Sequence, residues 1–300
     1  MKSNIVKMCL SAFFFIGGMI FARAMQVDYV SFKPSVGAFS LSADGRVATI
    51  CVDTADYKGV RVAARNLGTD IGRVTGTAAD VSLSLSSERG AVVVGTIGRN
   101  RQIDEWAKQG KLDVSAIEGK WESYLIQTVD GNLVIAGSDK RGTIFGIYDL
   151  SEKIGVSPWH YFADVPAQRH AALYVKPGRY VQDSPKVKYR GIFLNDEWPS
   201  LGGWASKKFG GFNSRFYAHV FELLLRLKAN YMWPAMWAWS FYADDPENSK
   251  TAHDMGIIMG TSHHEPMARN HQEWARKRKQ YGVWDYATNQ KVIDQFFREG

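Results

Sequence analysis

Cysteine is scarce in this 300-residue sequence, which contains only Cys9 and Cys51. Cys9 lies in an N-terminal apolar segment that we expect to be removed. Cys51 would then be the single thiol of the mature chain and could form no intramolecular disulfide. Cys9 also lacks the small residues that precede the cysteine of a lipoprotein cleavage site. We therefore expect neither disulfide bonds nor a lipid anchor.

The sequence also lacks an apolar run long enough to span a membrane. The apolar run from Met8 to Ala22 has about fifteen residues, fewer than the roughly twenty that a membrane-spanning helix needs. Lys2 and Lys7 precede this run, and the small residues of Ala22-Arg23-Ala24 follow it, as in a cleaved secretory signal. These features predict a signal peptide over residues 1–24, a periplasmic or secreted location, and no membrane contact after cleavage.

Basic residues are in only mild excess. The predicted signal peptide contains three of them, Lys2, Lys7 and Arg23, and no acidic residue, so its removal lowers the formal net charge from +7 to +4. The one notable basic run, Arg276 to Lys279, fits the solvated face of a helix. We therefore predict no nucleic-acid partner. Gly137 and Gly142 have the spacing of the glycines in a phosphate-binding loop, but Thr143 stands where such a loop has a lysine. We predict no cofactor.

Tryptophan, in contrast, is abundant. The chain has ten tryptophans, and most of them follow residue 195. Such a concentration fits either a large core or a surface that binds sugars, because aromatic faces pack against the apolar faces of pyranose rings.

The first half of the chain alternates strand-like and helix-like segments. Gly90 to Gly95 and Leu133 to Gly137 have strand character, and Thr143 to Ile154 has helical periodicity. We predict a mixed N-terminal α/β domain, of the α+β type, over residues 25–180.

A second region begins near Lys186 and repeats strand, helix and strand. This order is typical of the start of a parallel α/β sheet or a (β/α)8 barrel. A barrel needs roughly 250 residues, so we predict that residues 186–300 form only its first, incomplete part. The predicted elements are a strand over Tyr189–Leu194, a helix over Phe216–Lys228 and strands over Asn230–Trp237 and Met255–Gly260.

Polar residues follow the first and third of these strands, where the catalytic groups of a barrel gather. In Asn195-Asp196-Glu197, neighbouring side chains of an extended backbone point to opposite faces, so the two carboxylates cannot act as an acid and base pair. His263-His264-Glu265 resembles a zinc motif, but position 268 is Ala268 instead of the required second histidine. We predict no metal there, and expect the imidazoles and Glu265 to bind sugar hydroxyls or transfer protons.

The second strand ends in an aromatic run. Tyr231 to Trp239 contains three tryptophans and two methionines in nine residues. In isolation this run would be core, but its position after a barrel strand places part of it at the barrel mouth. We expect Trp239 and Trp237 at the mouth and Trp233 in the core.

Four segments of the sequence resemble glycoside hydrolase family 115, the xylan α-1,2-glucuronidases. These segments are Ala136–Pro166, Tyr189–Trp204 (YRGIFLNDEWPSLGGW), Phe216–Trp239 and Gly256–Met267 (GIIMGTSHHEPM). The resemblance implies an N-terminal α/β domain, then a (β/α)8 barrel and further C-terminal domains. It also implies an inverting hydrolysis that releases glucuronate, or its 4-O-methyl ether, from glucuronoxylan or aldouronic acid oligosaccharides.

The resemblance also assigns site residues. Asn195, Asp196, Trp239 and His264 would face the uronate, with Asp196 as the catalytic candidate. The general acid and the water-activating carboxylate would lie beyond Gly300. Arg269 could bind the substrate carboxylate through two hydrogen bonds, although an ion pair within a helix explains it equally well.

Two other functions stay open at this point. A hexosaminidase-like hydrolase often shares the preceding α/β domain, and a carbohydrate-binding fragment would bind sugar without cleaving it. The sequence leaves a homodimer open.

Overall fold

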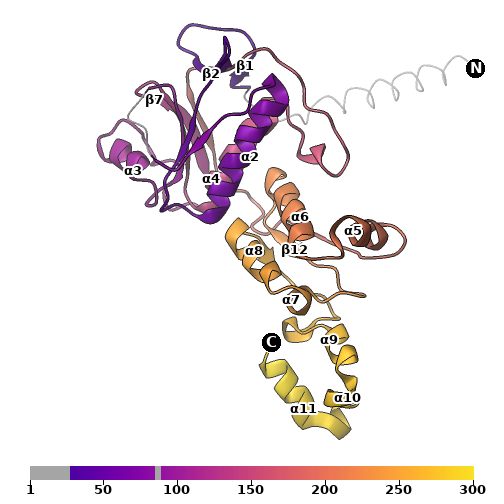
Figure 1. Ribbon diagram of the computed structural model, residues 1–300. Coiled ribbons are helices and arrows are strands. Elements are labelled where there is room, and N and C mark those ends of the chain that lie inside the picture. The colour runs from indigo at the N-terminus through magenta and orange to yellow at the C-terminus, as the bar shows by residue number, and fades with distance from the viewer. Residues whose placement is uncertain (1–27, 85–88) are drawn as a thin grey trace, which may run out of the picture.

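The computed structural model describes residues 28–84 and 89–300, which Figure 1 colours from indigo to yellow along the chain. The predicted signal peptide lies outside the described residues. In the part of the chain that is described, no helix is both long and apolar enough to cross a membrane. Two sheets form within residues 30–182, here called the first region, and one sheet forms within residues 191–259 of the second region, which runs to Gly300.

The largest sheet has six strands in the order β10-β7-β8-β6-β4-β5. Its members are β4 (Ile50–Val52), β5 (Val81–Ser82), β6 (Val92–Thr96), β7 (Tyr124–Val129), β8 (Asn132–Gly137) and β10 (Arg179–Gln182). β5, β4, β6 and β8 are parallel to one another. At one edge, β7 is antiparallel to β8, and β10 is antiparallel to β7. β6 and β8 confirm the two strands predicted from the sequence in this region.

Helices cover both faces of this sheet because successive residues of a strand point to opposite sides. In β6, Val92 and Val94 pack in one core with α2 (Lys58–Thr75) and α4 (Lys140–Lys153), whereas Val93 packs with α3 (Arg101–Lys108) on the other face. α4 begins at Lys140, earlier than predicted, because the Asp139 side chain accepts a hydrogen bond from the Gly142 N–H and caps the helix.

A smaller antiparallel sheet brings the start of the described chain beside residues near 175. Its order is β1-β9-β2-β3, with β1 (Val30–Ser31), β2 (Phe39–Ala43), β3 (Arg46–Val47) and β9 (Leu173–Val175). Between α4 and β9 lies the short 3-10 helix η1 (Pro158–His160), where the sequence predicted a connector.

The third sheet contains three parallel strands in the order β11-β12-β13, with α5, α6, α7 and α8 between them. Ile192 of β11 aligns with Met232 of β12, which aligns with Met259 of β13. This is the strand and helix alternation that the sequence predicted. The elements are β11 (Gly191–Phe193), α5 (Leu201–Phe209), α6 (Ser214–Arg226), β12 (Tyr231–Trp233), α7 (Phe241–Asp244), α8 (Glu247–Met255) and β13 (Ile258–Met259).

Three details of this sheet differ from the sequence prediction. The strand predicted over Asn230–Trp237 ends at Trp233, because Pro234 has no N–H to donate to a neighbouring strand. The residues from Pro234 onward form a loop. Met255 belongs to α8, so β13 is shorter than predicted. The helix predicted to reach Lys228 ends at Arg226, and the apolar side chain of Leu227 is exposed.

The last elements form a small helical unit, drawn in yellow at the foot of Figure 1. α9 (His271–Arg276), α10 (Arg278–Tyr281) and α11 (Tyr286–Arg298) follow the 3-10 helix η2 (Pro266–Ala268). Trp274, Ile293 and Phe296 form the core of this unit. The basic run from Arg276 to Lys279 is exposed, as predicted, and Arg276 pairs with Asp244.

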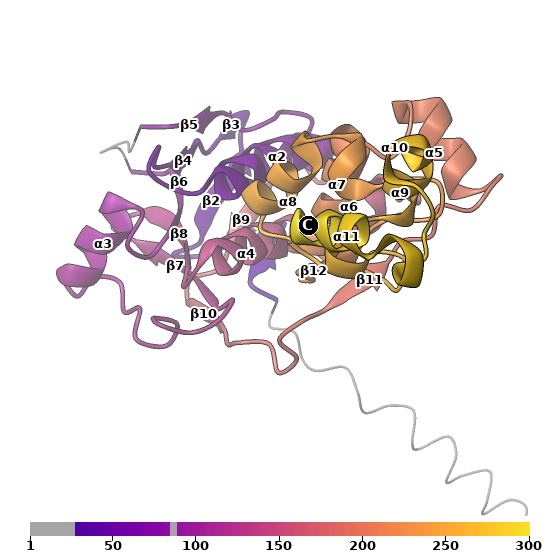
Figure 2. The ribbon, with the colours of Figure 1, turned by 90° about the horizontal axis from the view of Figure 1, so that it is seen from below.

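The two regions share one hydrophobic core. A continuous cluster of buried side chains extends from α2 and α4 into α6 and α8, and Figures 1 and 2 both show these helices side by side. Within this interface the buried guanidinium of Arg226 lies 2.8 Å from the buried Asp70 carboxylate. The first region therefore packs directly on the helices that surround the three parallel strands.

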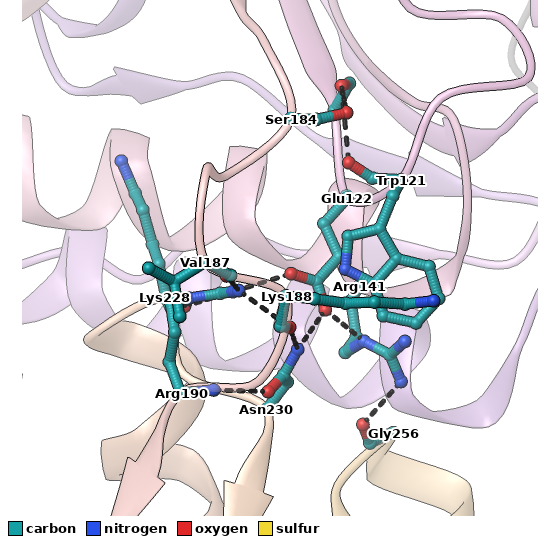
Figure 3. Close-up of polar contacts among 12 residues, drawn as sticks. Trp121, Glu122, Arg141, Ser184, Val187, Lys188, Arg190, Lys228, Asn230 and Gly256 are labelled. Atoms are coloured by element: carbon teal, nitrogen blue, oxygen red, sulfur yellow. Dashed lines mark hydrogen bonds and ion pairs between the residues drawn. The ribbon is translucent and has the colours of Figure 1, made fainter.

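A buried carboxylate fixes the amino ends of these strands (Figure 3). Glu122, which is 1% exposed, accepts hydrogen bonds from Arg141 Nε (2.5 Å), Arg190 Nη2 (2.6 Å) and Asn230 Nδ2 (2.6 Å). Arg190 immediately precedes β11, and Asn230 immediately precedes β12. Arg141 in turn donates to the Gly256 carbonyl, just before β13. Side chains of the first region thus hold the starting points of all three strands.

Candidate functional site

The polar residues predicted from the sequence gather at the carboxyl ends of β11, β12 and β13. The loops that follow these strands span residues 194–200, 234–240 and 260–270. Because the three strands are parallel, the three loops leave the sheet at the same edge. The prediction that strand ends bring these loops together is confirmed.

Asp196 links two of the loops. Its side chain is buried, with 2% of the residue exposed, and both oxygens accept backbone hydrogen bonds, from the Trp237 N–H (3.2 Å) and the Ala238 N–H (3.0 Å). Its neighbours Asn195 and Glu197 are exposed. The expected opposite orientation of Asp196 and Glu197 is thus confirmed. In the structure, Asp196 holds the β12 loop in place through these hydrogen bonds. Its catalytic role stays a prediction.

The tryptophans of the β12 loop are arranged differently from the prediction. Trp239 is half-buried: its ring lies 5.5 Å from that of Phe212, and its Nε1 is buried with no hydrogen-bond partner among the described residues. Trp237 is 46% exposed, and its ring lies 4.8 Å from that of His264. Trp233, expected in the core, is half-buried and donates to the Tyr231 hydroxyl. The aromatic ring beside His264 is therefore that of Trp237.

Three imidazoles form a chain next to Trp237. His264 lies between His263, at 4.0 Å, and His271, at 4.8 Å between ring centroids. Burial, and then the neighbouring His263 and His271, lowers the pKa of His264 below its ordinary value. This shift favours the neutral imidazole, which can either donate or accept a hydrogen bond. Residues 28–84 and 89–300 contain no group of three His, Cys, Asp or Glu side chains arranged to hold a metal ion.

Glu265 points into the protein. It is 1% exposed, and its oxygens accept hydrogen bonds from Asn270 Nδ2 (3.2 Å) and from the Ser262 N–H (3.3 Å). Burial raises the pKa of Glu265, although these two hydrogen bonds oppose the shift. The direct contact with sugar that the sequence suggested for Glu265 does not fit this orientation. Glu265 instead stabilises the β13 loop through these two buried hydrogen bonds.

Arg269 forms the ion pair that was the alternative explanation of this residue. Its guanidinium binds the Glu273 carboxylate at 3.0 Å and donates to the Phe296 carbonyl at 2.8 Å. It also lies 3.9 Å from the centre of the Phe296 ring. The predicted contact with a substrate carboxylate is therefore not supported, because these partners hold the guanidinium in the helical unit.

Asn270, which was not predicted from the sequence, organises the β13 loop. Asn270 is 1% exposed, and its Nδ2 donates both to Glu265 and to the Met236 carbonyl of the β12 loop. It also forms a capping box with Glu273 at the start of α9. The signal was present in the sequence, because Asn270 and Glu273 have the spacing of such a box.

Comparisons with known proteins agree with this architecture. Residues 182–300 match the family model described as Glycosyl hydrolase family 115. A solved structure of a family GH115 4-O-methyl-α-glucuronidase with specificity for decorated arabinogalactans is similar to this chain with 33% sequence identity and a TM-score of 0.73. The match covers 87% of this chain and 34% of that enzyme, so the chain spans about a third of its length.

Weaker likenesses are found among hexosaminidases. The chitobiase of Flavobacterium johnsoniae has 13% identity and a TM-score of 0.45 over 78% of this chain and 33% of its own. The β-N-acetylhexosaminidase of Streptomyces coelicolor has 12% identity and a TM-score of 0.43 over 78% of this chain and 46% of its own. No curated protein matches the chain. The identity to the solved glucuronidase, together with the share of the chain that it covers, shows that the chain belongs to glycoside hydrolase family 115.

Proposed function

We propose that the chain is the N-terminal part of an enzyme that removes α-1,2-linked glucuronate, or its 4-O-methyl ether, from xylan. The observation that carries this proposal is the 33% identity to a 4-O-methyl-α-glucuronidase over 87% of the chain. The loops of β11, β12 and β13 support it, because they place imidazole and exposed indole side chains at one edge of a parallel sheet. The signal peptide predicted over residues 1–24 would direct the enzyme to the periplasm or the medium.

The three parallel strands are proposed to begin a (β/α)8 barrel over residues 186–300, preceded by an N-terminal domain over residues 25–180. Two features support this proposal. A helix lies between successive strands, as in a barrel. β11 also exposes Ile192 and Phe193, as expected of a strand that lacks a neighbour on one side.

The catalytic acid and base are proposed to lie on later strands of the same barrel. Inverting hydrolysis requires two carboxyl groups about 6.5–9.5 Å apart across the scissile bond. At the three strand ends, the Asp196 and Glu265 carboxylates are both buried and bonded to protein groups. Neither is free to protonate a leaving group or to activate a water. Glu197 is the exposed carboxylate of these loops, and a single carboxylate cannot supply both the acid and the base. We therefore assign Asp196 a positioning role and Asn195, Trp239 and His264 a role in binding the uronate.

Uronate release by the full-length protein tests the proposal. Glucuronoxylan, aldouronic acid oligosaccharides and a decorated arabinogalactan would be incubated with the enzyme, and the released acids separated by ion-exchange chromatography. We expect 4-O-methylglucuronate from the xylan substrates. Release from arabinogalactan alone would refute xylan as the substrate and indicate decorated arabinogalactan instead. Release from none of the substrates would refute the proposed activity.

The stereochemistry of hydrolysis is a separate test. An inverting enzyme that cleaves an α-linkage produces the β-anomer first, and proton NMR during the first minutes distinguishes it from the α-anomer. Appearance of the α-anomer before mutarotation would refute inversion without affecting the substrate assignment. An aryl-hexosaminide assay tests the hexosaminidase alternative. Binding of oligosaccharide with no product formed would favour the carbohydrate-binding alternative.

A further inference from the structure

Trp198 is the most exposed tryptophan of the chain. It is 65% exposed, whereas Trp159, Trp237 and Trp284 are between 45% and 48% exposed and the other six are less so. Trp198 lies two residues after Asp196, in the loop at the carboxyl end of β11. In the part of the chain that is described, the indole therefore presents an aromatic surface to solvent.

The start of α5 is built to support this indole. A Cβ atom on Gly202 would come within 2.9 Å of Trp198 Nε1 and 3.0 Å of Cδ1, and one on Gly203 within 3.4 Å of Cε3 and Cζ3. Both rings of the indole therefore lie along the first turn of the helix, where the two glycines leave room for them.

Gly202 also ties the indole to the strand-end site. Its Cβ would lie 2.5 Å from the Asp196 carbonyl oxygen, so the same glycine contacts the backbone of Asp196 and the ring of Trp198. The Gly202 N–H donates to the Glu197 carbonyl, and Ser200 Oγ donates to the same oxygen. The indole is thus held by the loop that contains Asp196 and keeps a fixed position relative to it.

The surroundings of Trp198 distinguish a sugar from a protein partner. Asn195 and Glu197 are exposed, and neither side chain bonds to another residue in the described part of the chain. A single indole flanked by free amide and carboxylate groups matches a pyranose, which has an apolar ring face and polar hydroxyls at its rim. A protein-docking surface would instead present a contiguous apolar patch.

We propose that Trp198 is a platform for a pyranose ring of the polysaccharide main chain, beside the residue that carries the uronate. This assignment rests on the proposed function and adds a subsite to it. The sugar ring stacks on the exposed part of the indole, and Glu197 binds hydroxyls at its rim. Gly202 and Gly203 set the position of the platform without touching the substrate.

The test compares Trp198→Ala, Trp198→Leu and Trp198→Phe in the full-length protein. Trp159→Ala, at an exposed tryptophan of the first region, is the matched control. We expect Trp198→Ala and Trp198→Leu to raise KM for aldouronic oligosaccharides about tenfold, a change of about 1.4 kcal/mol. Trp198→Phe should recover most of this loss, because it keeps a flat ring. An aryl glucuronide has no main chain, so its kcat and KM should stay the same.

Three outcomes would overturn the platform. The first is an equal loss on oligosaccharide and aryl glucuronide, and the second is full recovery by Leu as well as by Phe. The third is that acrylamide does not quench the fluorescence of Trp198 and that Trp198→Phe lowers Tm. Together these results would show that another part of the protein covers the indole.

A binding measurement separates failure of the platform from failure of the proposed function. Undecorated xylo-oligosaccharides carry no uronate, so their binding does not depend on hydrolysis. We expect them to change the tryptophan fluorescence of the wild-type protein and of Trp159→Ala, but not that of Trp198→Ala. If no substrate released uronate and this change persisted, the platform would stand and the hydrolase assignment would fall. If uronate were released and this change were absent, only the platform would fall.

Discussion

The two ends of β11, β12 and β13 use their polar groups in opposite ways. At the amino ends, Glu122 is buried and bonded to Arg141, Arg190 and Asn230. At the carboxyl ends, some polar groups are buried and bonded, such as Asp196, whereas the side chains of Asn195 and Glu197 are exposed. The amino ends are thus closed by the first region, and the carboxyl ends remain accessible.

This difference separates stability from function within one small sheet. Polar groups that are buried and fully bonded fix the starting points of the strands. Groups with unused donors and acceptors, held on loops by those strands, can bind a ligand. Substitutions at the amino ends should therefore change folding, whereas those at exposed positions of the carboxyl ends should change binding with little effect on folding.

The largest effect is expected at the amino ends, from Glu122→Ala. Removal of the carboxylate leaves Arg141 and Arg190 close together without their shared counter-charge, and breaking a buried ion pair costs about 3–5 kcal/mol. Urea-induced unfolding followed by circular dichroism measures this loss. The control is Lys120→Ala, which removes the exposed ion pair with Asp183 and should cost under about 1 kcal/mol. Similar losses for the two variants would show that the Glu122 cluster does not anchor the strands.

A smaller effect on stability is expected from Asp196. Replacement by Ala leaves the Trp237 and Ala238 N–H groups without their charged acceptor, at a cost of about 2 kcal/mol. Asp196→Asn keeps one acceptor oxygen and should recover about half of this loss in the same unfolding experiment. For a residue that only positions the loop, Asp196→Asn should also recover part of kcat and leave the pH profile of kcat unchanged. A shifted profile, or no recovery, would return a direct catalytic role to Asp196.

The smallest effect concerns Glu265 and depends on pH. Burial raises the pKa of Glu265 in the folded state above its value in the unfolded chain. Between these two values the folded protein binds more protons, so its stability falls as pH rises through this range, by about 1.4 kcal/mol for each pKa unit. Glu265→Gln cannot ionise and lacks this fall.

The difference in Tm between Glu265→Gln and wild type should therefore increase from pH 4 upward and become constant above the folded pKa. Loss of the Ser262 hydrogen bond adds an offset that does not vary with pH. Glu197→Gln, at an exposed carboxylate of the same strand ends, serves as the control. A difference that decreased with pH would show that Glu265 is stabilised as the carboxylate.

Much of the fold could be predicted from local patterns. The apolar stripe on Phe216 to Leu224 and the strand character of Leu133 to Gly137 both depend on spacing along the chain, which the sequence shows directly. Predicted boundaries failed by a few residues. β12 ends at Trp233, directly before Pro234, which has no N–H for a sheet. The loop after it bonds to Asp196, a residue far away in the sequence.

The site could be predicted in position but not in detail. The polar residues after β11 and β13 indicated the correct edge of the sheet, because the carboxyl ends of parallel strands lie together. Which side chains are available at that edge depends on burial. Arg269 and Glu265 were both candidate substrate contacts. Arg269 instead forms the ion pair with Glu273 that was its alternative explanation, and Glu265 bonds to Asn270, which was not predicted.

The sequence by itself determined the compartment prediction, the strand and helix alternation of the second region and the resemblance to family 115, because all of these depend on residues close together in the chain. Only the tertiary structure decided that Glu122 joins the two regions, that Asp196 faces the protein and that Trp198 faces solvent. The physical reason is that burial and hydrogen-bond pairing depend on segments far apart in sequence. Glu122 and Asn230 are separated by 108 positions and meet at 2.6 Å.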